Sequence, residues 1–295
     1  MKPPQQLHIP VLFDTTMSIL APVASEKYLD LTAGYGGHAR EIISRIGGAQ
    51  NATLVDRDEN AIRELSNQCG FANARFLHSD FLAAAEKLRT ENQKFDMILM
   101  DLGVSSPQID KAERGFSFQK EAALDMRMDE SQELSAYQVV NQTSEKKLSE
   151  YLFKFGDESP KMARKIAHSI VLNRPIKTTK ELANVVIKVS PKRGKIHPAT
   201  RTFQAVRIIV NDELRQIRET LPLALELLNS GGRIAVISFH SLEDVIVKNY
   251  FQEQSRAGYE ATIKLLNKKP LTSDQNELVY NPRARSAKLR AAVKI

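Results

Sequence analysis

Three glycines and one aspartate have a spacing that suits nucleotide chemistry. The glycines are Gly34, Gly36 and Gly37, directly after an apolar run that ends in an acid. Glycine is needed where backbone must approach a ligand closely or adopt positive φ, and the helix expected over about Ala39–Ile46 would present free N–H groups there. Asp56 ends the next apolar run, about where nucleotide-binding α/β units place a ribose-binding acid. The spacing predicts an adenosine-like ligand at two strand ends.

The glycine pattern alone leaves the kind of ligand open. Gly34-x-Gly36-x-x-Ala39 also fits the dinucleotide fingerprint that ends in alanine, so NAD is an alternative. A glycine-rich turn with no ligand is the other alternative.

The elements around these residues alternate between strands and helices, which is typical of βαβ units and a parallel sheet. The run Phe95–Met100 is nearly all apolar, as expected for a central strand covered on both faces. Asp101 follows it, where open α/β sheets bind ligands. We expect strands at Ala52–Val55, Ala74–His78 and Phe95–Met100, and helices at Asp14–Leu20, Asn60–Gln68 and Leu82–Glu91.

After Asp101 about a hundred residues pass before another clear strand, far too many for a loop in a compact domain. The segment has helical patterns and is expected to be an inserted helical subdomain, so we predict a first sheet part over 1–109, an insert over 110–210 and a second sheet part over 211–295. Residues 256–280 are expected to form a terminal hairpin. Helices are expected at Glu145–Phe155, Lys161–Asn173, Thr179–Val189, Thr202–Ile209 and Asp212–Leu228, and a strand at Arg233–Phe239.

The composition is that of a soluble protein, with 42% hydrophobic and 26% charged residues among 295. No apolar run approaches the roughly 20 residues that cross a bilayer, and no secretory leader is recognisable. We therefore expect a cytoplasmic protein with no membrane partner. The single cysteine, Cys69, excludes an internal disulfide, and no Cys/His spacing indicates a metal site.

The net charge of +7 is distributed unevenly along the chain. Residues 161–210 contain twelve Lys/Arg and one acid, a balance of +11, which leaves −4 for the rest. A basic loop within this segment carries Lys192, Arg193 and Lys195, and a second basic run closes the chain after Asn281. Such concentration indicates a polyanion partner, although a solvated surface or a frayed tail would have the same composition.

Long motifs in a fixed order identify a resemblance to one family. The chain resembles the S-adenosylmethionine-dependent 16S rRNA cytosine-N4 methyltransferases, the ribosomal small-subunit methyltransferase H family. This resemblance implies a Rossmann-like α/β methyltransferase sheet with an inserted helical subdomain, S-adenosyl-L-methionine as cofactor, and 16S rRNA, within the small subunit, as partner. The motifs are DLGVSSPQ at 101–108, ERGFSF at 113–118, LDMRMD at 124–129, TFQAVR at 202–207, SFHSLED at 238–244 and NPRARSAKLR at 281–290.

The resemblance also implies which residues bind the cofactor. Phe81 would lie beside the adenine, with core packing as the alternative, and His38 could be merely a helix-start side chain. The implied cofactor residues are Gly36, Gly37 and His38 at the turn, Asp56 on the ribose, Phe81, and Asp101 with Gln108 nearer the methionine end.

The chemistry requires hydrogen-bond acceptors near the target amine, because the lone pair of an exocyclic amine is delocalised into the ring. Asp101 and Ser105 are the candidate catalytic residues. Related enzymes use an Asp/Asn/Ser-Pro-Pro-aromatic turn, and here Gln108 stands where the aromatic would be. Phe116, Phe118 and Phe239 are candidates to stack on an unstacked base, with core packing as the alternative for each.

Other functions remain open from the residues alone. Ser105 with His240 could suggest a hydrolase, but the Gly-x-Ser-x-Gly elbow is absent and Ser241–Asp244 is typical of a helix start. The rivals are methylation of another RNA base or position, a catalytically inactive nucleotide-binding RNA-binding protein, and an NAD-dependent oxidoreductase. A homodimer is left open, as is the residue that activates the amine.

Overall fold

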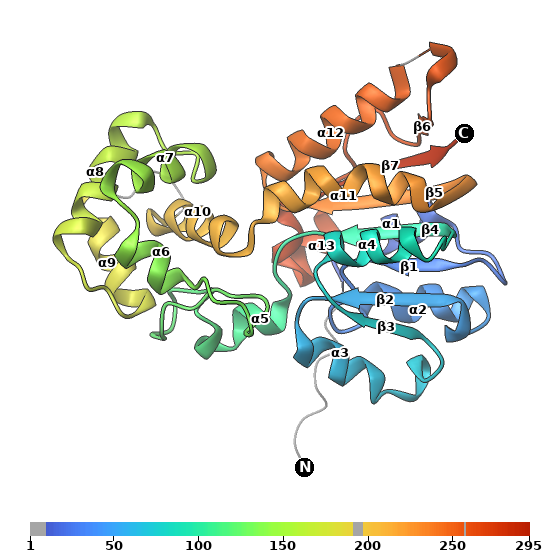
Figure 1. Cartoon of the computed structure of the whole chain (residues 1–295), viewed down its shortest axis with the longest axis horizontal. Helices are drawn as coiled ribbons and strands as arrows, with labels where there is room; N and C mark the ends of the chain where they lie inside the picture. The colour runs from blue at the N-terminus through green and yellow to red at the C-terminus, as the bar shows by residue number, and fades with distance from the viewer. Residues whose placement is uncertain (1–9, 191–196, 257) are drawn as a thin grey trace. The chain divides into compact units, whose positions relative to one another are not determined.

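The computed structural model describes residues 10–190, 197–256 and 258–295. The chain divides into two compact units. The sheet unit comprises Met1–Gly103 and Leu214–Ile295, and the helical unit comprises Val104–Glu213. Figure 1 shows the strands within the first unit and the helices α6 to α10 within the second.

The sheet unit is built on one seven-stranded sheet with the order β3-β2-β1-β4-β5-β7-β6. Strands β1 to β5 pair in parallel, whereas β7 is antiparallel to both of its neighbours. This arrangement confirms the predicted α/β class with a parallel sheet. The strands are β1 (Tyr28–Asp30), β2 (Ala52–Asp56), β3 (Arg75–His78), β4 (Phe95–Asp101), β5 (Leu228–Ser238), β6 (Ile263–Leu265) and β7 (Lys288–Lys294).

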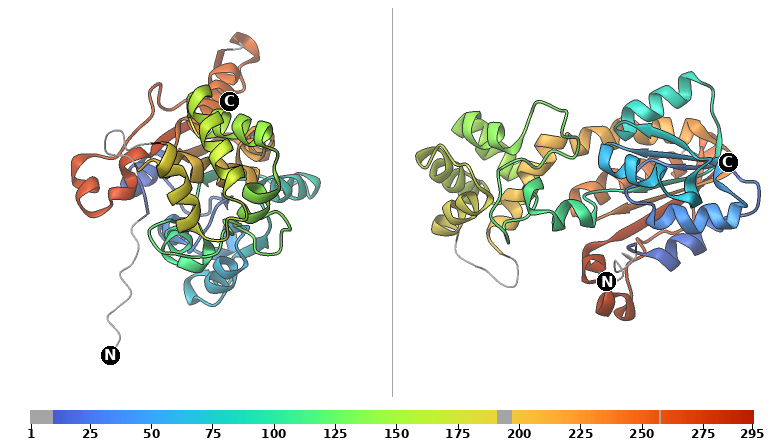
Figure 2. Two further views of the ribbon diagram at one scale, coloured as in Figure 1. Left: turned by 90° about the vertical axis from the view of Figure 1, so that its left-hand side faces the viewer. Right: turned by 90° about the horizontal axis from the view of Figure 1, so that it is seen from below.

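Helices cover both faces of this sheet (Figure 2). One face packs against α1, α2 and α3 through a core that includes Met17, Ile42 and Leu65. On the other face lie α4 and α11. Among the described residues, no helix combines the length and apolarity needed to cross a bilayer. The helices of this unit are α1 (Phe13–Leu20), α2 (Gly37–Ile46), α3 (Glu59–Ser66), α4 (Phe81–Thr90), α11 (Glu213–Leu227), α12 (Ser241–Arg256) and α13 (Gln275–Tyr280).

The carboxyl-terminal segment differs from the sequence-based expectation. The expected hairpin over 256–280 is wrong, because this stretch contains the short strand β6 and the helix α13. The basic tail is not frayed, because β7 lies between β5 and β6 inside the sheet. Arg290 is buried there, and its guanidinium donates hydrogen bonds to both carboxylate oxygens of Asp244, 2.6 Å to Oδ1 and 3.3 Å to Oδ2.

The helical unit has a hydrophobic core of its own, formed by residues such as Val140, Leu152, Ile166 and Val186. Its helices begin at polar caps that the sequence displays. Thr178 and Glu181 form a capping box at the start of α9, which satisfies two backbone donors reciprocally. The helices are α5 (Ser106–Asp110), α6 (Ala136–Gln142), α7 (Glu145–Phe155), α8 (Pro160–Leu172), α9 (Thr179–Val189) and α10 (Ala199–Asn211).

Candidate functional site

Three neighbouring parallel strands each end in an aspartate. Asp30 ends β1, Asp56 ends β2 and Asp101 ends β4, and β1 pairs in parallel with both other strands. The three residues therefore share the carboxyl edge of the sheet, where open α/β folds bind ligands. The sequence predicted Asp56 and Asp101 as site residues but not Asp30. The signal was present, since Asp30 is the acid that ends the first apolar run.

Asp56 is held by two backbone donors. Gly34 N–H donates to Oδ2 at 2.7 Å and Asp58 N–H donates to Oδ1 at 2.8 Å. Burial raises the pKa of Asp56 to about 6 against the opposing effect of these hydrogen bonds. Each carboxylate oxygen offers more than one acceptor site. Asp56 can therefore hold the glycine turn and still accept hydrogen bonds from ligand hydroxyls.

Two glycines of this turn have positive φ, as expected from the sequence, with 52° at Gly34 and 81° at Gly36. A Cβ at Gly36 would lie 2.6 Å from side-chain carbons of both Leu65 and Phe71, and one at Gly37 would lie 2.7 Å from Cγ of Pro10. A side chain at Gly36 or Gly37 would therefore collide with the protein itself, and the cofactor role of both glycines stays a prediction. At Gly34 the nearest atom would be a backbone oxygen at 3.9 Å, so this position faces open space.

Asp30 is anchored from within the core. The Tyr28 hydroxyl donates to Oδ2 at 2.6 Å, and the Thr32 N–H donates to Oδ1 at 3.1 Å. Tyr28 is fully buried and Asp30 is 2% exposed. Burial raises the pKa of Asp30 to about 6, although both hydrogen bonds oppose the shift.

Asp101 has an unsatisfied buried oxygen. Its Oδ1 has no hydrogen-bond partner within the part of the chain that the structure describes, while the side chain as a whole is 26% exposed. The backbone N–H of Asp101 donates to the Thr32 hydroxyl at 2.6 Å. Burial, followed by the nearby charges of Asp30 and Glu243, raises the pKa of Asp101 well above its ordinary value. At the carboxyl edge of the sheet, a buried acceptor of this kind is available to a ligand.

His38 is a core residue as well as a helix-start residue. It is 5% exposed, and its ring stacks on Phe13 with centroids 6.1 Å apart. Nε2 lies 3.1 Å from the carbonyl oxygen of Val11, and Nδ1 lies 3.7 Å from Oδ2 of Asp101. The structure thus brings His38 and Asp101 together at one edge.

Phe81 is the first residue of α4, behind the N-cap Asp80, whose side chain accepts from Ala83 N–H. The Ser79 N–H donates to the Asp56 carbonyl at 3.0 Å, which holds this loop beside the end of β2. The Phe81 ring is half-buried. This exposure suits both adenine contact and core packing, and its cofactor role stays a prediction.

Ser105 and Gln108 form a capping box at the start of α5. Gln108 N–H donates to the Ser105 hydroxyl at 3.4 Å, and Ser105 N–H donates to Oε1 of Gln108 at 3.0 Å. Both side chains belong to the helical unit and have a structural task there. The Ser105 hydroxyl retains its own proton for a further hydrogen bond, and its catalytic role stays a prediction.

The aromatic residues expected to stack on a base are at least partly structural. Phe118 stacks on His197 with centroids 4.4 Å apart and meets Phe203 edge-on at 5.0 Å. Phe116 packs against the core of the helical unit, and Phe239 packs against the core of the sheet unit. Core packing therefore explains much of their burial.

Some of the positive charge of the insert is used internally. Arg207 pairs with Glu213 through two hydrogen bonds of 2.9 and 2.8 Å, and Arg174 donates to two backbone carbonyls, of Val140 and Thr143. Arg201 lies 3.5 Å from Asp157. Among the described residues of 161–210, the exposed cations other than Arg201 are Lys161, Arg164, Lys165, Lys177, Lys180 and Lys188. The predicted RNA-binding residues Lys192, Arg193 and Lys195 lie outside the described residues.

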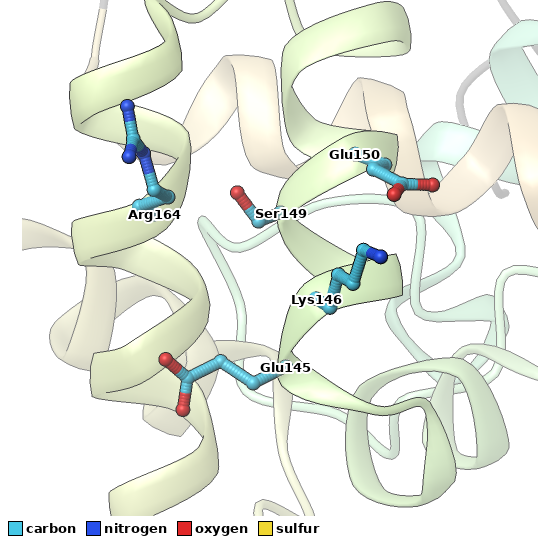
Figure 3. A pocket seen from close by; sticks show the side chains of 5 residues that line it. All are labelled: Glu145, Lys146, Ser149, Glu150 and Arg164. Carbon is cyan, nitrogen blue, oxygen red and sulfur yellow. The ribbon is translucent and has the colours of Figure 1, made fainter.

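A shallow pocket in the helical unit has a mixed lining, in which the acids Glu145 and Glu150 alternate with Lys146 and Arg164 around Ser149 (Figure 3). Glu145 and its neighbours lie on α7, and Arg164 lies on α8. The two acids and two cations of this lining balance each other, so we do not expect this pocket to attract a polyanion.

The strand-end edge fits a ligand that carries hydroxyl groups and a positive charge. Among the residues that the structure describes, neither Asp30 nor Asp101 forms an ion pair with a lysine or arginine. Their burial without a cation raises both pKa values, and an opposite charge within a few ångströms would favour the ionised forms. Asp56 offers the acceptors for a diol.

Comparison with known proteins places the whole chain in one group. The model of the MraW methylase family matches residues 5–295. A ribosomal RNA small subunit methyltransferase H from Caldicellulosiruptor saccharolyticus is 43% identical over 98% of this chain and 99% of that protein. The corresponding proteins of Acidobacterium capsulatum and Coxiella burnetii are each 44% identical with the same coverage.

Among solved structures, the chain is similar to an rRNA methylase from Streptococcus thermophilus, with a TM-score of 0.46 and 10% identity over 98% of this chain and 99% of that one. A likeness this low has no bearing on function.

Proposed function

Since this chain belongs to the MraW methylase family, we propose that it transfers a methyl group from S-adenosylmethionine to the N4 amine of a cytosine in 16S rRNA. Family membership makes the chain a methyltransferase and sets the NAD-dependent oxidoreductase aside. The structural observation that carries the proposal is the orphaned Oδ1 of Asp101 at the strand edge that Asp56 shares.

The cofactor would be held by groups that the fold already positions. Asp56 would accept hydrogen bonds from the ribose hydroxyls while its two backbone donors keep it fixed. Phe81 would lie against the adenine from the loop beside Asp56. The acids Asp30 and Asp101 would offset the positive charge of the methionine end. The cofactor supplies an electrophilic methyl group bound to a sulfonium.

The target amine would be activated by acceptors and by alignment. Methyl transfer forms a C–N bond, breaks the C–S bond, and leaves the amine nitrogen with a proton to lose. The Asp101 carboxylate would accept a hydrogen bond from the amine and then receive that proton, and the Ser105 hydroxyl would offer a second acceptor. Alignment of the reacting groups contributes on the order of 7–11 kcal/mol in such reactions, so no strong base is needed.

Transfer to nitrogen is favoured over transfer to carbon C5, because C5 transfer requires a cysteine nucleophile. The single cysteine, Cys69, lies in a short 3-10 turn (Cys69–Phe71) that precedes β3. Cys69 is exposed and precedes β3 in the chain, whereas Asp101 ends β4. Methylation of a different RNA base and loss of catalysis are the remaining rivals, and both are outcomes of the assays below.

The helical unit is proposed to bind the RNA, with Lys192, Arg193 and Lys195 among its phosphate contacts. The support is its sequence balance of +11 over 161–210 and the exposed cations on its helices. An rRNA substrate within the small subunit implies a cytoplasmic enzyme. Whether it acts as a homodimer is a matter for sedimentation.

Calorimetric titration with S-adenosylhomocysteine and with NADH tests the cofactor. Stoichiometric binding of the first and no binding of the second is the expected result. Incubation with labelled S-adenosylmethionine and either protein-free 16S rRNA or assembled small subunits then identifies the substrate. We expect incorporation into the assembled subunit. Binding without incorporation into either RNA would favour the catalytically inactive alternative.

A further inference from the structure

The hydrogen bond between His38 and Val11 fixes one proton on the histidine ring. Nε2 lies 3.1 Å from the Val11 carbonyl oxygen, and a carbonyl can only accept a hydrogen bond. Nε2 must therefore carry a hydrogen. The neutral ring then has an unprotonated Nδ1, because a neutral imidazole has one donor nitrogen and one acceptor nitrogen.

That second nitrogen faces an acid. Nδ1 of His38 lies 3.7 Å from Oδ2 of Asp101. If both groups lacked the additional proton, the lone pair of Nδ1 would face a carboxylate across a buried contact. A single proton removes this repulsion, either on Nδ1 as an imidazolium opposite a carboxylate or on the carboxyl group opposite a neutral ring.

The surroundings of the pair favour keeping that proton. Asp30 and Tyr28 on β1 and Glu243 on α12 face Asp101, and His38 itself projects from α2. Burial is the main cause that raises the pKa of Asp101, and the charges of Asp30 and Glu243 add to it by disfavouring a further negative charge. Among the described residues, the charged or titratable groups that act on Asp101 are therefore two acids and a phenol.

We propose that His38 and Asp101 share one proton in the ligand-free protein and that a cationic cofactor expels it on binding, which makes His38 a positioning residue that sets the charge of Asp101. The proton leaves to solvent, the ring keeps its Nε2 hydrogen, and the carboxylate faces the cofactor. This inference rests on the proposed function, because it assumes S-adenosylmethionine as the ligand.

Release of a proton on binding makes the affinity for the cofactor depend on pH. A ligand that expels a proton binds more tightly as pH rises, until the free protein has lost that proton by itself. Asp30 and Asp56, with pKa values of about 6, are already ionised at about pH 8. Proton release at that pH therefore reports on the pair and not on the other two acids.

The test is calorimetric titration of the whole protein with S-adenosylmethionine at about pH 8, in two buffers of different ionisation enthalpy, which counts the protons released. The wild type should release between about half and one proton more than Asp101→Asn. His38→Gln keeps an N–H donor for Val11 but cannot hold the shared proton, so it should also release fewer protons than the wild type. The cofactor's own amine contributes equally in all three proteins and cancels.

Equal proton counts for the wild type and Asp101→Asn would overturn the inference, as would a count for His38→Gln that matches the wild type. A complete lack of binding heat in the wild type would instead refute the cofactor assignment. If a variant fails to fold, nitrogen NMR of His38 in the wild type decides the matter. Nδ1 should lose its proton, or its interaction with a protonated acid, when the cofactor binds, whereas an unchanged Nδ1 signal contradicts the proposal.

Discussion

The backbone N–H of Gly34 donates a 2.7 Å hydrogen bond to Oδ2 of Asp56 and so joins the turn after β1 to the end of β2. The same carboxylate receives the Asp58 N–H through Oδ1. One side chain therefore shapes the glycine turn and presents acceptors at the ligand edge. This double task explains why an acid at this spacing is informative in the sequence.

Replacing Asp56 by alanine should weaken binding of S-adenosylhomocysteine by roughly 1–3 kcal/mol, because hydrogen bonds to a charged acceptor are lost. The glycine turn should also become less rigid, since Gly34 loses its partner. Isothermal titration measures the affinity.

Asp96→Ala is the matched control for this change. Asp96 also accepts a hydrogen bond from a backbone N–H, that of Lys27 at 2.8 Å. It lies near the start of β4, whereas Asp101 lies at the end of this strand. It should lower stability without changing cofactor affinity. Equal losses of affinity in Asp56→Ala and Asp96→Ala would contradict a direct contact.

Asp30→Asn should make the protein more stable at neutral pH while weakening cofactor binding. The pKa of Asp30 is raised from 3.8 to about 6 in the folded protein, so the protonated carboxyl group stabilises the fold. This stabilisation is complete below pH 3.8 and is lost as the pH rises through about 6. The shift corresponds to at most about 3 kcal/mol at neutral pH. An asparagine amide can accept from Thr32 and donate to Tyr28 without any charge.

Thermal unfolding at about pH 5 and about pH 8 checks this sign. The variant should melt several degrees higher than the wild type at the upper pH, with a smaller difference at the lower pH. Asp274→Asn exchanges one good N-cap residue for another at α13. This control variant should melt at the wild-type temperature at both pH values. A variant of Asp30 that is less stable at the upper pH would refute the account.

Arg290→Ala should destabilise the sheet unit by up to roughly 3–5 kcal/mol, because it leaves the buried Asp244 carboxylate without its main partner. Lys288, 3.1 Å from Asp244, should recover part of this loss. Hydrogen bonds from Arg290 and Lys288 outweigh the effect of burial and lower the pKa of Asp244 in the folded protein. The ion pair therefore stabilises the fold at any pH above 3.8, the ordinary pKa of this carboxyl group. This stabilisation is lost as the pH falls through the lower pKa of the folded state.

Chemical denaturation at neutral and acid pH measures both effects. The gap between wild type and Arg290→Ala should narrow in acid, and adding Asp244→Asn to the variant should restore stability. Lys288→Ala, whose side chain is 37% exposed, should cost no more than about 1 kcal/mol. If Arg290→Ala left stability unchanged, the buried ion pair would not stabilise the sheet unit, which would contradict this account.

The triple change Lys192→Glu, Arg193→Glu and Lys195→Glu should raise the RNA dissociation constant and flatten its salt dependence. Each lost phosphate contact reduces the slope of log affinity against log salt by about 0.7 to 0.9, so roughly two units should disappear. Filter binding over a salt series gives the slope, and cofactor affinity should stay constant.

Lys146→Glu, Lys147→Glu and Lys154→Glu make the matched control, since they change the net charge equally but lie on α7, where two acids stand among the three cations. This control should alter the slope much less. If both triples act alike, net charge rather than a defined contact explains the binding.

The sequence predicted the elements whose signals are local. The helix Thr179–Val189 has its capping residues beside it, and the apolar run at Phe95 indicated the central strand, which the structure extends to Asp101. Strand β7 was missed because a basic segment is typical of a solvated tail. The acid that makes Arg290 compatible with the interior lies 46 positions away, at Asp244, and no local pattern reveals such a partner.

The sequence predicted those parts of the candidate site whose signals are local. Acids at strand ends can be recognised from spacing, which selected Asp56 and Asp101. The collision that excludes a side chain at Gly36 involves Leu65 and Phe71, which depends on how α2 and the segment after α3 pack. The contact between His38 and Asp101 likewise depends on tertiary structure.

The measurement that tests the central claim most directly is nucleoside mass spectrometry of 16S rRNA from cells that lack this gene, complemented with the wild type or with Asp101→Asn. The wild type should restore N4-methylcytidine, identified against N4- and C5-methylcytidine standards, whereas Asp101→Asn should restore little or none. Identical nucleoside profiles with and without the wild-type gene, or restoration of a C5-methylated product, would contradict the proposed function.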